Sequence, residues 1–156
     1  DVAAAKAAIE QAMRDNDPVA GLKAEFRRLA KERRDLKLVV LDSAEAPAEG
    51  IDSTLLVYVA HAGLAGKKGI NPDLWVLLSL RCAVRSPQLL YGGYQRLVGY
   101  DNKKKRRKFL EWAAADARYL RGELRQAYPF LAESVLKAVL DAKGMQAKPA
   151  EPARAK

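Results

Sequence analysis

Six consecutive cationic residues, Lys103 to Lys108, form the segment of this sequence with the clearest chemistry. At about 100° per residue their side chains would point in every direction around a helix, so the segment cannot lie flat on an apolar core without burying a charge. Ammonium and guanidinium groups at this density suit contacts with phosphate. The run therefore indicates a polyanionic partner. The alternative is a block of like charges that is simply solvated.

Two predicted helices, Asn102 to Ala127 and Pro18 to Arg34, carry further cations in rows. In the first, the cations fall within about 60° of one another and form a stripe about 33 Å long, which can follow a phosphate backbone. In the second, nearby acidic residues such as Glu25 and Glu32 could instead pair with the cations and leave little net field. The candidate nucleic-acid-binding residues are Lys23, Arg27, Lys31, Arg34, Lys103, Lys104, Arg106, Arg107, Arg118, Arg121 and Arg125.

Residues suited to catalysis or metal binding are scarce. The sequence has no P-loop glycine pattern, no nucleophile elbow and no histidine-rich ligand spacing. Its single cysteine, Cys82, excludes an internal disulfide, and with the single histidine, His61, it cannot build an ordinary histidine and cysteine metal cluster. We expect Cys82 to be packed and His61 to lie in the core or at a subunit contact. The prediction is a protein that is not an enzyme, with no metal, no cofactor and no small-molecule substrate.

Charge and length bound the class of protein. The chain has 156 residues, which suits one domain, and a formal net charge of +9. Residues 101 to 156 carry 14 basic and 7 acidic groups, so the excess is C-terminal. Such a balance favours nucleic acid or another anionic surface. No stretch approaches 18 uninterrupted apolar residues, which argues against a membrane span, and the start at Asp1 suggests processing or a fragment.

The elements that must position these charges are predicted to be helices. A capping residue followed by proline at Asp17-Pro18, Asn71-Pro72 and Ser86-Pro87 predicts helices running to about residues 34, 85 and 99. Helices are also predicted over 2–14, 53–66, 102–127 and 129–143. The run 36–41 is helical or irregular, and 42–50 is a loop.

The expected fold class is all-α: a compact helical bundle with an extended N-terminal helical arm and a flexible C-terminal tail. The expected domain organisation is an arm over 1–16, a helical domain over 17–144 and a mobile tail over 145–156.

The segment Arg85 to Tyr100 interleaves tyrosines with glycines and polar groups. Its aromatic rings could stack on bases, but a stripe of leucines, Tyr94 and valine favours core packing. The run Ser-Pro-Gln-Leu-Leu-Tyr-Gly-Gly-Tyr-Gln-Arg-Leu at 86–97, followed by a long basic helix, resembles the major coat proteins of filamentous and rod-shaped archaeal viruses with linear double-stranded DNA. The resemblance covers the middle and the C-terminal half of the chain.

This resemblance implies a virion protein that assembles helically, wraps DNA held in A-form and contacts phosphates without reading bases. The implied partners are double-stranded DNA of any sequence and homologous coat subunits, as a homo- or hetero-oligomer. The acidic loop 42–49 and the long polar tail have no counterpart in that family.

Two other classes of protein remain open. One is a basic helical subunit of a ribonucleoprotein, chromosome-associated or organelle complex, soluble and intracellular, that acts as an interaction scaffold. The other is a helix-turn-helix regulator, which is disfavoured because the segment after Ser86-Pro87 presents leucine and glycine rather than base-reading side chains. The sequence leaves DNA and RNA undistinguished.

Overall fold

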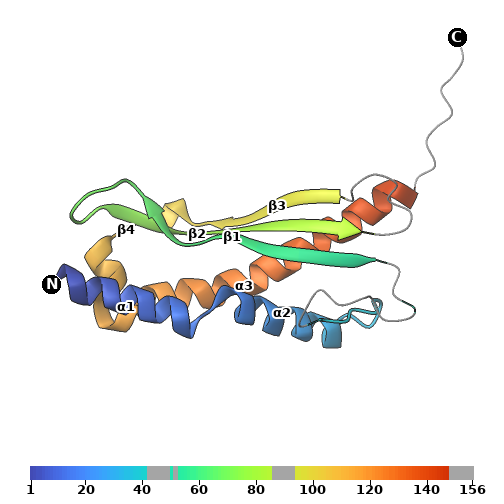
Figure 1. Cartoon of the computed structure of the whole chain (residues 1–156), viewed down its shortest axis with the longest axis horizontal. Helices are drawn as coiled ribbons and strands as arrows, with labels where there is room; N and C mark the ends of the chain where they lie inside the picture. The colour runs from blue at the N-terminus through green and yellow to red at the C-terminus, as the bar shows by residue number, and fades with distance from the viewer. Residues whose placement is uncertain (42–49, 51–52, 86–93, 148–156) are drawn as a thin grey trace, which may run out of the picture.

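The fold has two layers, a β-sheet above and helices below (Figure 1). The computed structural model describes residues 1–41, 50, 53–85 and 94–147. Within this part, a four-stranded antiparallel sheet packs with one face on three α-helices. The prediction of an all-α bundle is therefore wrong: the protein belongs to the α+β class. The predicted tail lies almost wholly outside the described residues.

The sheet is formed by β1 (Thr54–Gly66), β2 (Asp73–Arg85) and β3 (Tyr94–Asp101), in that order. The short β4 (Arg107–Lys108) pairs with the start of β2. Leu74 pairs with both Gly66 of β1 and Arg107 of β4, so β4 lies on the side of β2 away from β1. Residues 102–108, which join β3 to α3 and which we call the basic connection, thus lie at the opposite edge of the sheet from β1.

Alternation along β2 explains why this segment is a strand. Val76, Leu78, Leu80, Cys82 and Val84 are buried, whereas the residues between them lie on the other face, as the period of two in a strand requires. The helices predicted over 71–85 and 53–66 are wrong. Helix prediction also fails for 94–99, which lies in β3, while residues 86–93 lie outside the described part.

The first two helices agree with their sequence signals. α1 (Val2–Asp15) and α2 (Pro18–Glu32) confirm the predictions for 2–14 and 18–34. The Asp17 carboxylate accepts a hydrogen bond from the Ala20 N–H at 3.0 Å, and Pro18 occupies the first helical turn. α1 is not an extended arm, because its buried Ala5 and Ala12 face the interior and the helix packs along α3. The run 36–41 is irregular, within the prediction made for it.

α3 (Phe109–Ala147) begins later than the predicted helix at 102 and is interrupted. Lys103–Lys105 form a 3-10 turn, η1, and β4 follows. Ala115, Asp116 and Ala117 have φ values of 50°, 56° and 54°, a left-handed turn that costs roughly 1–2 kcal/mol per non-glycine residue. Beyond it the helix continues through Pro129, where a separate helix was predicted. The stripe drawn on one continuous helix from residue 102 is consequently wrong in its geometry.

The core lies between the sheet and α3. Trp112, Leu120, Leu124, Leu131 and Val135 of α3 are fully buried against the inner face of the sheet. The Trp112 indole N–H donates to the Leu74 carbonyl at 3.0 Å, which ties the first turn of α3 to β2. Cys82 is buried, as predicted, and its burial raises the pKa of the thiol to about 11. The core and the Trp112 hydrogen bond therefore fix the position of α3 relative to the sheet.

Two helical glycines allow a matched test of this packing. A Cβ on Gly21 of α2 would lie 2.5 Å from the Tyr128 ring, whereas a Cβ on Gly122 of α3 would meet nothing within 4 Å. We expect Gly21→Ala to destabilise the protein by about 1–3 kcal/mol through overpacking. We expect Gly122→Ala to stabilise it by up to about 1 kcal/mol through helix propensity. Urea unfolding measures the change in the free energy of unfolding for each variant. Equal changes for the two variants would contradict the packing of α2 on α3.

Candidate phosphate-binding site

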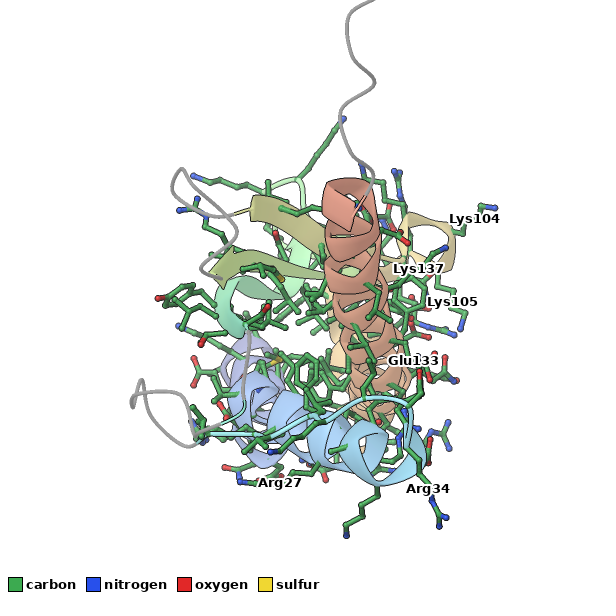
Figure 2. All side chains as sticks on the ribbon, turned by 90° about the vertical axis from the view of Figure 1, so that its right-hand side faces the viewer. Arg27, Arg34, Lys104, Lys105, Glu133 and Lys137 are labelled. Carbon is green, nitrogen blue, oxygen red and sulfur yellow. The ribbon has the colours of Figure 1, made fainter. Side chains whose placement is uncertain are left out.

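The connection from β3 to α3 folds back on the long part of α3, and a small open depression lies between them. Its volume is about 230 Å³, and it is open to solvent. Figure 2 shows Lys104 and Lys105 on this connection beside α3. The described residues that line the depression are Lys105, Arg107, Arg118, Tyr119, Gly122, Glu123 and Gln126. We call this depression the basic pocket.

Tyr119 organises two guanidinium groups at the basic pocket. The Arg107 guanidinium carbon lies 3.8 Å from the centre of the Tyr119 ring, and that of Arg118 lies 5.2 Å away. Stacking uses the face of a guanidinium group and leaves the N–H donors at its edge. Among the described residues, no carboxylate forms an ion pair with either arginine. The pair is thus fixed in position and can still donate to an anion.

Glu123 anchors the other side of the basic pocket. It is only 8% exposed, and its Oε2 accepts hydrogen bonds from the Tyr100 hydroxyl at 2.7 Å and the Asn102 amide at 2.6 Å. Its Oε1 accepts from Lys105 Nζ at 2.8 Å. Burial alone would raise the pKa of Glu123, but the hydrogen bonds from Lys105, Tyr100 and Asn102 outweigh it and lower that pKa. Glu123 is therefore ionised at neutral pH and holds the connection against α3.

A second aromatic ring, Trp75 of β2, supports the outer part of the connection. Lys103 Nζ lies 5.4 Å and the Arg106 guanidinium 5.1 Å from the centre of its ring. The Trp75 indole N–H is buried and has no hydrogen-bond partner in the described part of the chain. The cationic run is thus spread over two aromatic rings rather than around one helix.

The remaining lysines of the run have different surroundings. Lys108 pairs with Asp73 at 3.2 Å, and Lys103 lies 3.8 Å from Asp101. Lys104 is exposed and forms no ion pair with the described residues. Exposed pairs of this kind contribute little to stability, so the cations of the run remain close to the surface and near one another.

Arg121 and Arg125 lie on α3 outside the lining of the basic pocket. Arg121 donates from Nη1 to Asp15 at 2.7 Å and from Nε to the Asp116 carbonyl at 2.8 Å. The hydrogen bond to Asp15 is the main cause of its raised pKa. Arg121 therefore joins the end of α1 to the left-handed turn in α3. Arg125 is exposed.

The α2 cations form a separate group. Figure 2 places Arg27 and Arg34 with α2 along the lower edge of the view, away from Lys104. Lys31 and Arg34 are exposed, as is Arg27, and Lys23 is half-buried. The acidic residues of α2 are engaged by Arg28, which pairs with Glu25 and Glu32 at 2.7 Å each and reaches Glu133 at 3.4 Å. Arg28 is not one of the cations of the predicted row, so these ion pairs do not decide between a phosphate-binding row and a salt-bridged surface on α2.

Sequence reasoning named Arg107 and Arg118 but missed the residues that bring them together. Tyr119, Gly122 and Gln126 were not candidates, and Lys105 was part of the cationic run but was not named as a phosphate ligand. The adjacency of Arg118 and Tyr119 is the one signal that could have indicated stacking. His61 is exposed on the outer face of the sheet, so of the two places expected for it, the core and a subunit contact, the structure excludes the core.

Comparisons of the chain with protein-family models, with curated proteins and with solved structures found no match. None of the described helices is long and apolar enough to cross a membrane. In the same residues, no three potential metal-ligating side chains converge. The function proposed below is therefore based on the fold and the basic pocket.

Proposed function

We propose that this protein binds nucleic acid by contacting phosphates, without reading bases. The observation that carries the proposal is that the guanidinium groups of Arg107 and Arg118 lie over the Tyr119 ring, 3.8 and 5.2 Å from its centre, at the basic pocket. Three cations and one carboxylate are among the residues that line the pocket. Arginine edges present paired N–H donors that match phosphate oxygens. A phosphate at the pocket mouth would be met by donors that are already in place.

The size of the basic pocket favours one unit of a polymer over a complete small molecule. Its volume of about 230 Å³ is below the roughly 300–1,000 Å³ of typical small-molecule sites. Lys103, Lys104 and Arg106 lie on the same connection and extend the positive surface beyond the pocket. Contacts with several consecutive phosphates give binding that does not depend on base sequence.

A coat subunit on double-stranded DNA is the more specific form of this proposal. It depends on a resemblance carried by the order of helices, and β1, β2 and β3 stand where three of those helices were predicted. We therefore place nucleic-acid binding first and filament assembly second. Electron microscopy separates them: DNA-dependent filaments are expected of a coat subunit, and salt-sensitive binding without filaments supports a protein that does not assemble along DNA.

The test of the proposal adds a side chain at a lining residue of the basic pocket. Gly122 lines the pocket, and a side chain there extends into open space. We expect Gly122→Leu to weaken binding to duplex DNA on the order of tenfold, equivalent to the removal of one charge-assisted hydrogen bond, with Gly122→Ala as the control that keeps most of the space. Titrations at several salt concentrations with unrelated sequences should give equal affinities for each protein. Wild-type binding that is absent at low salt would instead support an interaction scaffold.

A further inference from the structure

The outer edge of β1 is an unpaired edge with unusual composition. β1 pairs with β2 along one side, and no strand in the described part of the chain pairs with its other side. Its 13 residues, Thr-Leu-Leu-Val-Tyr-Val-Ala-His-Ala-Gly-Leu-Ala-Gly, contain no Asp, Glu, Lys or Arg. A long apolar edge with exposed N–H and C=O groups is a template for pairing with another strand.

The opposite edge of the sheet is protected. β3 has only 8 residues, it includes the charged Arg96 and Asp101, and β4 occupies the position that follows it along β2. Short strands and charged side chains are the usual means of preventing edge pairing. β1 has one irregularity, the bulge between Val59 and His61, and otherwise none of these features. The two edges of one sheet therefore differ in a way that singles out β1.

Apolar side chains continue from this edge onto the outer face of the sheet. The helices cover only the inner face (Figure 1). On the outer face, Tyr58 of β1 is 57% exposed and Leu97 of β3 is 65% exposed, and Arg81 of β2 pairs with both positions in the register. Leu56 lies on the same face of β1 and is partly exposed. A partner aligned on the edge would also cover part of this surface.

The charge distribution points to a second copy of the same chain as the partner. With a net charge of +9, two copies repel each other over most approaches. The β1 strand is the exception among the exposed edges, because it contains no Asp, Glu, Lys or Arg, so pairing two β1 strands places no like-charged strand residues opposite each other. Since β4 and the basic pocket lie on the far side of β2, pairing through β1 leaves both pockets at the outer edges. A two-fold axis needs only that the strand fit itself antiparallel.

We propose that two copies associate through antiparallel pairing of their β1 strands and form one continuous sheet. This inference is independent of nucleic-acid binding. It assigns His61, which lies at the bulge of β1, to a subunit contact, one of the two places expected for this histidine from its apolar neighbours in the sequence.

Sedimentation equilibrium without nucleic acid tests the proposal. We expect a dimer for the wild type and a monomer for Tyr58→Lys, since the change puts a cation on the pairing strand of each copy and charged side chains on an edge strand disfavour pairing. The control is Ile70→Lys in the turn between β1 and β2, which is 89% exposed and lies outside the strand, so it adds the same charge and should remain a dimer.

Three results would overturn the proposal: a monomeric wild type at all concentrations, a dimeric Tyr58→Lys, or equal dissociation of both variants. Circular dichroism checks that Tyr58→Lys is folded. Hydrogen exchange adds a second readout, because β1 amides on the outer edge become protected only as the concentration of wild-type protein rises. Loss of dimerisation with DNA binding retained would leave the phosphate proposal standing, and the reverse pattern would leave this one.

Discussion

Arg107→Gln combined with Arg118→Gln is expected to lower the affinity for duplex DNA about 100-fold, from roughly 1.4 kcal/mol for each phosphate interaction that is removed. Both guanidinium groups face the Tyr119 ring, so the double change removes the paired donors and leaves the ring in place. The slope of log K against log salt should become shallower by about 0.9 for each B-DNA phosphate that is no longer neutralised. Titrations at four or more salt concentrations measure both effects.

The control must change the net charge equally. Lys6→Gln with Lys67→Gln removes two exposed cations, one on α1 and one in the turn after β1, both outside the lining of the basic pocket. We expect this control to change the affinity by only a small factor and to leave the slope nearly unchanged. Similar reductions in affinity for the two double variants would show that net charge, rather than the stacked pair, determines binding. Arg107→Lys with Arg118→Lys should fall between them, because charge is kept while the stacked planar donors are removed.

The helical part of the fold was predictable where the signals are local. Asp17 and Pro18 define the start of α2 through a cap and a fixed φ, and both act within one turn. Asn71-Pro72 carries the same signature but precedes a strand. There, the Pro72 carbonyl accepts a hydrogen bond from the Phe109 N–H at 3.0 Å, an interaction between residues far apart in sequence. A capping residue followed by proline therefore does not by itself distinguish the start of a helix from the start of a strand.

The strands were missed for a physical reason that differs between β1 and β2. β1 has apolar residues on both faces and no charged side chain on its outer face. Its sequence therefore lacks the alternation that would distinguish a strand from a buried helix. β2 does alternate from Val76 to Val84, but Trp75 and Leu77 on its outer face hide the pattern in its first half. Leucine-rich runs of this kind are decided by tertiary pairing.

The cations of the basic pocket could be picked out from the sequence, but their convergence could not. The cations are visible in the sequence, and the concentration of positive charge singled out residues 103–108 and Arg118. Their convergence depends on the left-handed turn over Ala115–Ala117, where three non-glycine residues adopt a conformation that no propensity indicates. The role of Glu123 could not be predicted for the same reason, since its hydrogen-bond partners Tyr100 and Lys105 precede that turn in the sequence.

Glu123→Ala is expected to act on stability and on binding in opposite directions. The change leaves the Tyr100 hydroxyl and the Asn102 amide without their acceptor in a half-buried setting, at a cost of about 3 kcal/mol in the free energy of unfolding. It also removes the carboxylate among the described residues that line the basic pocket and releases Lys105. The folded variant should therefore bind DNA more tightly and with a steeper salt slope than the wild type.

Glu123→Gln separates charge from hydrogen bonding. The amide keeps an acceptor for Tyr100, so we expect a smaller loss of stability, about 1–2 kcal/mol, with a similar gain in affinity. Because the folded-state pKa of Glu123 lies below its ordinary value of 4.5, the stabilisation by its carboxylate is complete above that pH and is lost as the pH falls through the folded pKa. The difference in unfolding free energy between wild type and Glu123→Gln should shrink accordingly as the solution is made more acidic than pH 4.5. A difference that stays constant through this range would mean that the carboxylate is not paired with Lys105 in solution. Weaker DNA binding by the folded Glu123→Ala protein would show that Glu123 matters more by holding the connection in place than by its negative charge.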